Sequence, residues 1–266
     1  MNILEYGAIP DGVTDNKLIL QEMIAKGFDL EIPKQIDPNR KFYVGSPLYI
    51  SNKTRTTISG RGTLLFNKTR GIIINGTVSK DCLVEGITIE GASEGVYIHG
   101  AYRTVVRDCR VLDFTEYGIN IDGFSNNHDV KVKSSLISTS IENNLAIGVR
   151  LGSVDSFCDD NTIIGASIGV VCDAPACDIT NNHIFRGVQG GHLSKAVVLR
   201  TGANHLILVT GNYLDNAHDV FLEVTSDQDN TILVAFNKFL RKDNPNAPWI
   251  TGDITPVMGN IYRDNS

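Results

Sequence analysis

The stretch from Gly95 to Asp122, "GVYIHGAYRTVVRDCRVLDFTEYGINID", holds one full copy of a pattern and the start of the next. The copy opens with a glycine and alternating apolar residues, "GVYIHG", and the pattern returns as "GINIDG". Across the chain it starts at Gly71, Gly95, Gly118, Gly148 and Gly169, with weaker versions at Ala196 and Val220. Successive starts lie 21 to 30 residues apart. Such a repeat, with loops of different length, is typical of a solenoid in which each copy forms one coil.

A second strand pattern follows in each copy, for example "VRDCRVL", "ITNNHIF" and "VTGNYLD". One of its columns contains Ile87, Cys109, Ser135, Asn161, Asn182, Asn212 and Asn237. If each copy is one coil, these side chains stack about 4.8 Å apart, the spacing between neighbouring strands. The four consecutive asparagines therefore predict an amide ladder, in which each side chain hydrogen-bonds the next.

The residue types of the repeats indicate the fold class. Between Thr54 and Lys238 the chain is dominated by Val, Ile, Thr, Gly and Asn, and apolar residues alternate with period two. This periodicity is typical of strands rather than helices. We therefore predict an all-β protein, a right-handed parallel β-helix. A β-sandwich is the alternative, but it would not need equivalent positions to recur at coil spacing.

One helix is expected, near the N-terminus, in "NKLILQEMIAKG". Asp15 is its predicted N-cap and Gly27 its predicted end. The apolar residues at helical spacing are Leu18, Ile19, Met23 and Ile24. This short amphipathic helix would cap the open end of the β-helix, whose apolar interior must be covered.

Three segments are predicted along the chain. Residues 1–30 form the N-terminal segment with the capping helix, residues 31–242 the parallel β-helix, and residues 243–266 a C-terminal end segment. "LEIPK" from Leu30 would be the first strand. The end segment contains no helix pattern, so the C-terminal end of the solenoid would be covered by this segment, by symmetry mates or by another protein.

Composition excludes several function classes. The chain has 266 residues, is 42% hydrophobic and carries a net charge of −6, without a basic run, so nucleic acid is not an expected partner. No stretch approaches the ~18 apolar residues of a membrane span, and the N-terminus has no signal-peptide pattern. The five cysteines have no zinc-like spacing and are expected to be small buried residues of a protein made in a reducing compartment. We expect no metal and no cofactor.

The N-terminal residues resemble a known superfamily. "YGAIPDGVTDNKLILQEMI" from Tyr6 is followed by "LEIPK", "FYVGSPLYI" and "TISGRGTLLF". This order resembles the start of the pectate-lyase-like single-stranded right-handed parallel β-helix superfamily, in which a [FY]-G-A-x-x-D-G-x-T-D-[DN] stretch leads into a capping helix. The match covers about the first 70 residues, and the repeats extend it to the whole chain at the level of fold.

The branch that looks closest is that of phage tailspikes and depolymerases. The resemblance implies a host surface polysaccharide, of capsule or lipopolysaccharide type, as the main partner. It also implies a homotrimer, contacts with other virion tail proteins, and a location in the virion tail after synthesis in the host cytoplasm. A bacterial protein, cytoplasmic or secreted by a non-classical route, is the alternative.

The first strand of each repeat predicts where a site could lie. Its apolar positions should point inward, so the residues between them point outward. On this outward face the predicted polar and aromatic groups are Tyr97, His99, Asn120, Asp122, Arg150 and Asp173, and Arg200 extends the row. The residue types suit acid/base chemistry and sugar recognition better than a merely solvated surface does.

Asp122 and Asp173 are the predicted catalytic pair. They lie two coils apart, which places them roughly 9–10 Å apart, and the small Gly152 between them would leave space there. Inverting glycosidases hold two carboxyl groups about 6.5–9.5 Å apart so that a water fits between them. Arg150 could keep one carboxylate ionised. The remaining residues, Tyr97, His99, Asn120, Arg150 and Arg200, would bind substrate.

Two alternatives use the same face differently. In a non-catalytic receptor-binding or structural spike, the face would only hold glycan. In a polysaccharide lyase, Arg150 would neutralise a uronate carboxylate, and Tyr97 or His99 would abstract the neighbouring proton.

Overall fold

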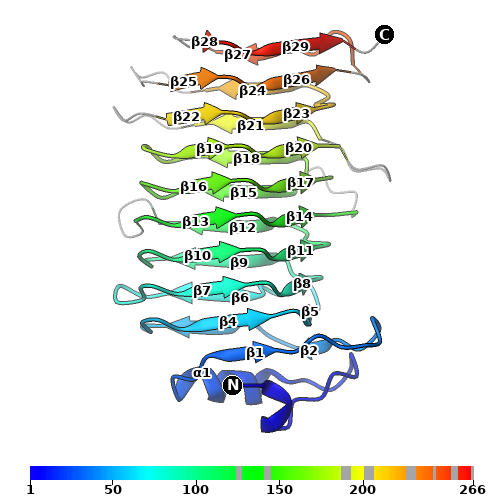
Figure 1. Cartoon of the computed structure of the whole chain (residues 1–266), viewed down its shortest axis with the longest axis vertical. Coiled ribbons are helices and arrows are strands. Elements are labelled where there is room, and N and C mark those ends of the chain that lie inside the picture. Colours follow the sequence, from blue (N-terminus) through cyan, green and yellow to red (C-terminus); the bar gives the residue numbers. More distant parts are fainter. Residues whose placement is uncertain are drawn as a thin grey trace.

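The computed structural model describes residues 1–123, 128–140, 145–186, 193–200, 207–225, 232–241, 244–252 and 257–264. Three parallel sheets, here called A, B and C, stack coil upon coil along one long axis (Figure 1). Each coil gives one strand to each sheet, in the order A, B, C along the chain. The predicted all-β parallel solenoid is therefore confirmed.

The strands of each sheet are as follows. Sheet A consists of β1 (Leu30–Ile32), β4 (Thr57–Gly60), β7 (Leu83–Glu85), β10 (Val105–Arg107), β13 (Lys131–Lys133), β16 (Phe157–Asp159), β19 (Asp178–Thr180), β22 (Ile207–Thr210), β25 (Ile232–Ala235) and β28 (Val257–Met258). Sheet B consists of β2 (Phe42–Val44), β5 (Thr63–Phe66), β8 (Thr88–Glu90), β11 (Arg110–Leu112), β14 (Leu136–Ser138), β17 (Thr162–Ile164), β20 (His183–Phe185), β23 (Tyr213–Asp215), β26 (Lys238–Arg241) and β29 (Ile261–Asp264). Sheet C consists of β3 (Leu48–Ser51), β6 (Ile72–Asn75), β9 (Glu94–His99), β12 (Tyr117–Asp122), β15 (Ile147–Leu151), β18 (Ile168–Cys172), β21 (Lys195–Leu199), β24 (Val220–Val224) and β27 (Ile250–Thr251).

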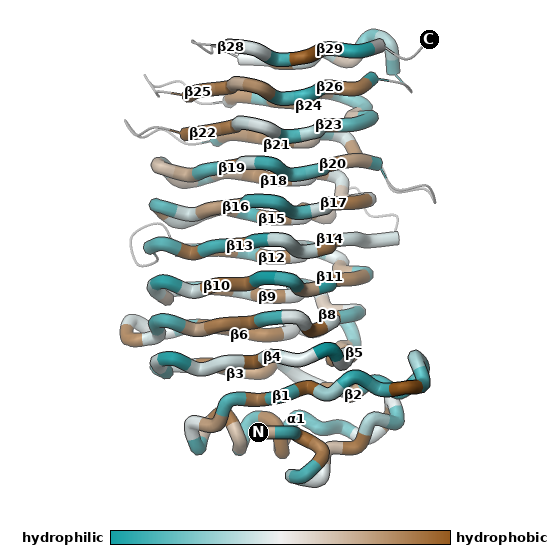
Figure 2. The backbone as a smooth tube through the Cα atoms, in the orientation of Figure 1, coloured by the Kyte–Doolittle hydropathy of each residue, from teal (hydrophilic) through white to brown (hydrophobic). Residues whose placement is uncertain are grey.

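The core is a set of stacked aliphatic columns inside the three sheets. In sheet C, Val96 pairs with Ile119, which pairs with Val149 on the next coil. All three are fully buried. Apolar and polar residues alternate along the coils (Figure 2), so each strand has one face toward the core and one toward solvent. The inward columns predicted from the repeat are confirmed.

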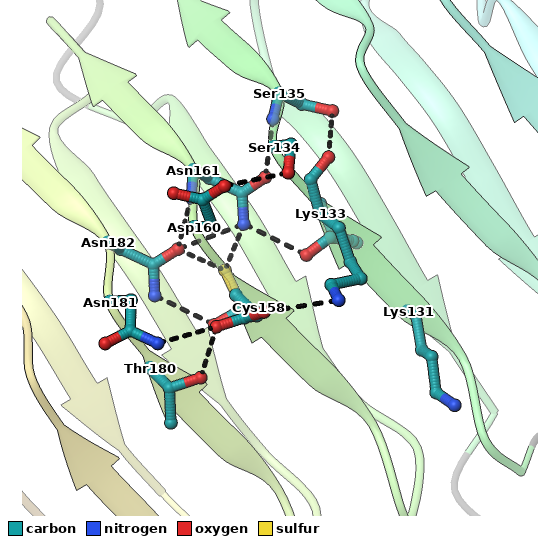
Figure 3. Close-up of polar contacts among 12 residues, drawn as sticks. Lys131, Lys133, Ser134, Ser135, Cys158, Asp160, Asn161, Thr180, Asn181 and Asn182 are labelled. Atoms are coloured by element: carbon teal, nitrogen blue, oxygen red, sulfur yellow. Dashed lines mark hydrogen bonds and ion pairs between the residues drawn. The ribbon is translucent and has the colours of Figure 1, made fainter.

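The asparagine ladder forms at the turn from sheet A to sheet B. Asn161 donates to the side-chain oxygen of Asn182 at 3.0 Å (Figure 3). Asn182 in turn donates to the side-chain oxygen of Asn212 at 3.0 Å. Asn212 continues the ladder to Asn237 at 2.9 Å, and Asn237 to Asn260 at 3.1 Å. Each acceptor oxygen also receives a backbone N–H of the preceding coil. These polar groups can therefore be buried because their hydrogen bonds are satisfied.

The N-terminal end is covered by a 3-10 helix, η1 (Ile3–Tyr6), and by α1 (Lys17–Ala25), which lies at the base of the solenoid (Figure 1). Two details of the predicted helix were wrong. Its N-cap is Asn16 rather than Asp15, whose carboxylate instead accepts from the N–H groups of Lys17 and Gly45. Leu18 is 79% exposed, and Leu20 takes its place in the core. The reason is that Leu20, Met23 and Ile24, at i, i+3 and i+4, form the face that meets the first coil.

At the other end, the predicted end segment contains β27, β28 and β29, which pair with β24, β25 and β26. Trp249 packs against Phe221, Phe239 and Tyr262, with ring centroids 5.0, 6.1 and 5.5 Å away. This aromatic cluster covers part of the apolar interior where the last coils end. Among the described residues, no helix has the length and apolarity to cross a membrane.

Candidate functional site

The outward face of sheet C brings most of the predicted site residues together. Tyr97 on β9 pairs with Asn120 on β12, and Asn120 pairs with Arg150 on β15. In the next outward row His99 pairs with Asp122. The parallel register therefore places these side chains on neighbouring coils, as the repeat predicted.

Arg150 bridges the two predicted catalytic carboxylates. Its Nε donates to Asp173 Oδ2 at 2.7 Å, and an Nη donates to Asp122 Oδ1 at 3.2 Å. Partial burial alone would lower the pKa of Arg150, but the hydrogen bond and charge of Asp173, together with the charge of Asp122, raise it. The guanidinium therefore stays charged, and one cation stabilises two anions across three coils.

The space predicted between the two carboxylates is occupied by this side chain. A Cβ added to Gly152 would lie 3.6 Å from the guanidinium carbon of Arg150 and 2.6 Å from the carbonyl oxygen of Ile121. The close approach of the Ile121 carbonyl oxygen therefore requires the glycine, and the Arg150 guanidinium lies in ordinary contact distance of this position. The expectation of an open gap over Gly152 was wrong, because the long side chain of Arg150 folds across it.

Two aromatic rings extend the network toward the N-terminal end. The Tyr97 hydroxyl donates to Asp122 Oδ2 at 3.0 Å, and the ring of Tyr97 is stacked with that of His99 at 6.2 Å between centroids. His99 Nδ1 lies 4.0 Å from the same Asp122 oxygen. Burial, and then the hydrogen bond to Asp122, raise the pKa of Tyr97. Tyr97 is consequently held as a neutral hydrogen-bond donor.

An ion pair between the buried Glu94 and the exposed Arg70 supports this surface and was missed by the sequence reasoning. Glu94 is only 2% exposed, accepts from Arg70 Nε at 2.7 Å and accepts from Asn120 Nδ2 at 2.8 Å. The Arg70 guanidinium also lies over the Tyr97 ring, 4.2 Å from its centroid. Arg70 and Glu94 each stand directly before a repeat glycine. The position directly before each repeat glycine was the sequence feature from which this ion pair could have been predicted.

Asn120 is therefore part of the floor of the site rather than of its surface. It is 4% exposed, and its Oδ1 has no hydrogen-bond partner among the described residues. The prediction that Asn120 is exposed to substrate is therefore wrong, because its side chain is buried. Its side chain is turned toward Glu94, because a buried carboxylate needs donors on both oxygens.

Beyond Arg150 the outward face of sheet C becomes apolar. Val171 and Val198 occupy the next positions of the same row and are 0% and 1% exposed. They form a small apolar cluster with Ile147, against which Tyr117 and Ile168 pack. Arg200 is exposed and lines a separate cleft of about 630 Å³ with Tyr117, Leu145, Ile147 and Ile168. Among the described residues, Asp173 is paired with Arg150 and not with Arg200, so the polar network ends at Asp173.

The three stacked sheets define a parallel β-helix protein with a polar network on one outer face. Residues 33–247 match the family described as "Periplasmic copper-binding protein (NosD)", and the chain belongs to this family.

Solved structures of phage tailspikes have a similar fold. A mutant tailspike protein of E. coli bacteriophage HK620 has a TM-score of 0.70 and 13% identity, and the tailspike of the same phage in complex with pentasaccharide has a TM-score of 0.68 and 14% identity. Each match covers 100% of this chain and 63% of the tailspike chain. The predicted likeness to the tailspike branch is thus confirmed for the fold.

Proposed function

We propose that the protein binds a polysaccharide along the outward face of sheet C, with the network around Arg150 as the centre of the site. The observation that carries the proposal is the shared contact of Arg150 with Asp122 and Asp173, flanked by the Tyr97 and His99 rings. Sugars present hydroxyl groups that can donate and accept, together with apolar ring faces. Fixed carboxylates, a charged guanidinium and amphipathic aromatic rings supply the matching partners. The complex of a structurally similar tailspike with a pentasaccharide supports this choice of ligand class.

Binding is tested on immobilised bacterial capsule and lipopolysaccharide O-chain polysaccharides. Arg150→Met removes the bridging cation while keeping the aliphatic packing, and Tyr97→Phe removes only one hydroxyl. We expect Arg150→Met to abolish binding and Tyr97→Phe to weaken it by roughly 3- to 10-fold, the loss of one hydrogen bond. Arg107→Gln, which changes an ion pair on sheet A, is the control. Retained binding by Arg150→Met, with unchanged thermal stability, contradicts the proposal.

Hydrolysis by Asp122 and Asp173 is the second part of the proposal. One carboxyl group would protonate the leaving oxygen and the other would activate water, as in an inverting glycosidase. Arg150 lies between the two carboxyl groups and donates a hydrogen bond to each. Catalysis therefore requires that bound substrate separates one carboxyl group from Arg150. Asp122→Asn and Asp173→Asn should each lower the release of reducing ends at least 100-fold while leaving binding within a few-fold; unchanged cleavage contradicts the role.

The lyase alternative is less well supported. A lyase needs a base, and the raised pKa of Tyr97 makes its hydroxyl a poor one at neutral pH. His99 would then have to abstract the proton. An unsaturated product that absorbs in the ultraviolet, lost in His99→Gln, would favour the lyase; its absence together with new reducing ends favours the hydrolase.

Copper binding, named in the family description, does not fit the described residues. Copper prefers imidazole, thiolate and thioether ligands. Among the described residues no group of three or more His, Cys, Asp or Glu side chains could hold a metal ion. Burial raises the pKa of Cys109 and of Cys158 to about 12, which disfavours the thiolate that binds metals.

Assembly and location remain proposals. A homotrimer in a virion tail, with contacts to other tail proteins, would agree with the tailspike-like fold. The mass of the particle in solution, measured by light scattering, tests it: three chain masses support the trimer, and a single chain mass contradicts it.

A further inference from the structure

A second groove lies on a different sheet from the network described above, at the start of sheet B. The loop between β1 and β2 projects beside β5 (Figure 1) and forms one wall. The outward residues of β5, β8 and β11 form the floor, where Thr63 pairs with Thr88 and Thr88 with Arg110. The groove has a volume of about 550 Å³.

The lining of this groove is strongly basic. Its charged residues are Lys34, Asp37, Arg40, Lys41, Arg61, Glu90 and Arg110, so five bases face two acids. The whole chain, in contrast, carries a net charge of −6. Among the described residues, Lys41 is the one base of the five that forms an ion pair, with Glu90 at 2.5 Å. Within the part of the chain that the structure describes, the other four bases of the groove have no carboxylate partner in an ion pair.

The wall of the groove is anchored at its Lys41 end and folded on itself. Gly12 N–H donates to the Lys41 carbonyl oxygen at 2.9 Å, and the Lys41–Glu90 pair ties the loop to β8. Within the loop, Asp37 accepts from the N–H groups of Asn39 and Arg40 at 2.9 and 3.0 Å. A groove with fixed walls loses little entropy when a ligand enters, which favours binding.

We propose that this groove binds the carboxylate groups of an acidic polysaccharide segment, with Arg61 and Arg110 as the principal contacts. Guanidinium groups match carboxylates in two-point geometry. Arg110 lies two strands from Thr63, or roughly 9–10 Å along the stack, so successive bases can meet successive charges of an extended chain. Thr63 and Thr88 also line the groove and can meet neutral sugar hydroxyls. This site is independent of the face of sheet C and does not require that face to bind glycan.

Nucleic acid is the competing polyanion, and the groove fits it less well. Proteins that bind single strands stack the bases on aromatic side chains, and the lining described for this groove contains none. A duplex needs a basic surface larger than this groove, and the net negative charge of the protein opposes it at long range.

The test uses the full chain and three probes: hexamers of galacturonate and of mannuronate, and a neutral glucose hexamer. Titration calorimetry should detect binding of at least one uronate hexamer, weakened by added salt, and no binding of the glucose hexamer. Arg61→Gln combined with Arg110→Gln should weaken uronate binding at least 10-fold. Arg61→Lys combined with Arg110→Lys should keep part of the uronate affinity. Circular dichroism checks that the variants, which change exposed side chains, remain folded.

Matched controls separate this site from the sheet C site. Arg103→Gln combined with Arg107→Gln removes two exposed bases that are paired with Asp81 and Glu85, and should leave uronate affinity unchanged. Any uronate binding that Arg150→Met removes belongs to the sheet C face, and the groove variant should cause the same loss of affinity in the Arg150→Met background as in the wild type. The proposal is overturned if neither uronate binds, if the groove variant binds as tightly as the wild type, or if a single-stranded hexanucleotide binds more tightly than both uronates.

Discussion

Asn182 shows how one side chain can connect three coils. Its oxygen accepts from the backbone and the side chain of Asn161, both at 3.0 Å, and its Nδ2 donates to the Cys158 carbonyl oxygen at 2.8 Å and to Asn212 at 3.0 Å. It is 1% exposed, so water cannot replace these partners. All these hydrogen bonds can form because residues about 25 positions apart in the sequence are stacked on neighbouring coils.

Replacing Asn182 with Leu should therefore be costly. The change leaves several buried groups without partners, at about 1–3 kcal/mol for each, and we expect a loss of about 3 kcal/mol and a clearly lower midpoint of thermal unfolding. Asn260→Leu is the control, since Asn260 is only partly buried at the end of the ladder. A similar loss in both variants would argue that the ladder interior has no special role.

Asp11, in the N-terminal turn, gives a prediction about pH. Its carboxylate accepts from the Thr14 hydroxyl at 2.6 Å and from the N–H groups of Thr14 and Val13 at 2.7 and 2.9 Å. These hydrogen bonds, that of the Thr14 side chain first, lower the pKa of Asp11 from 3.8 to about 2. The stabilisation is complete above the unfolded pKa and is lost as pH falls through the folded one.

The expected result is a pH-dependent difference between wild type and Asp11→Asn. The gap in unfolding midpoint should be constant above about pH 5 and should shrink between pH 4 and pH 2. A gap that does not change over this range would show that the charge of Asp11 contributes nothing. Scanning calorimetry at several pH values measures it.

At the scale of the element, sheet C contains a column of repeat glycines that lets neighbouring coils approach. A Cβ at Gly148 would lie 2.5 Å from Ile163 Cγ2 and 2.6 Å from the Gly169 carbonyl oxygen. Both distances are far below ordinary contact. The glycine that marks each repeat in the sequence is thus required by packing between coils and against the sheet B column.

Gly148→Ala should destabilise the protein by about 2 kcal/mol or more, because backbone must move to admit the methyl group. The control is Ala196→Gly, at the equivalent place two coils on, where the chain already accommodates a methyl group. That change should cost only about 0.5–1 kcal/mol. Equal stability of Gly148→Ala and wild type in urea titrations would contradict the packing argument.

The candidate site shows which features of a strand can be predicted from its sequence. The period-two pattern gave the correct outward positions of Tyr97, Asp122 and Arg150, because strand alternation is a local property. It could not give the direction of the Arg150 side chain or the burial of Asn120. Those depend on contacts between residues 23 to 28 positions apart, such as Arg150–Asp173 and Arg150–Asp122.

For the whole molecule, the open ends of the solenoid are the places that need protection. At the N-terminal end α1 contributes Leu20, Met23 and Ile24 to the common core. An uncovered end would expose apolar columns and unpaired strand edges, which promote association. The C-terminal end uses strands and the Trp249 cluster instead.

Leu20→Asp should uncover the N-terminal end. Burying an unpaired carboxylate is unfavourable, so we expect α1 to detach, the unfolding midpoint to fall by several degrees, and larger species to appear in light scattering as concentration rises. Leu18→Asp is the matched control on the same helix, because Leu18 is 79% exposed. Identical behaviour of the two variants would contradict the role of α1 as a cap.

The sequence by itself determined the parallel β-helix, the inward columns and the asparagine ladder, because each rests on a periodicity that recurs from coil to coil. It also predicted which outward positions could form a site. Only the tertiary structure decided that Arg150 fills the space between Asp122 and Asp173, that the buried Glu94 pairs with Arg70, and that Leu20 replaces Leu18 in the core. The physical reason is that repeats define where a side chain starts, whereas its final direction and partners depend on the neighbouring coils that surround it.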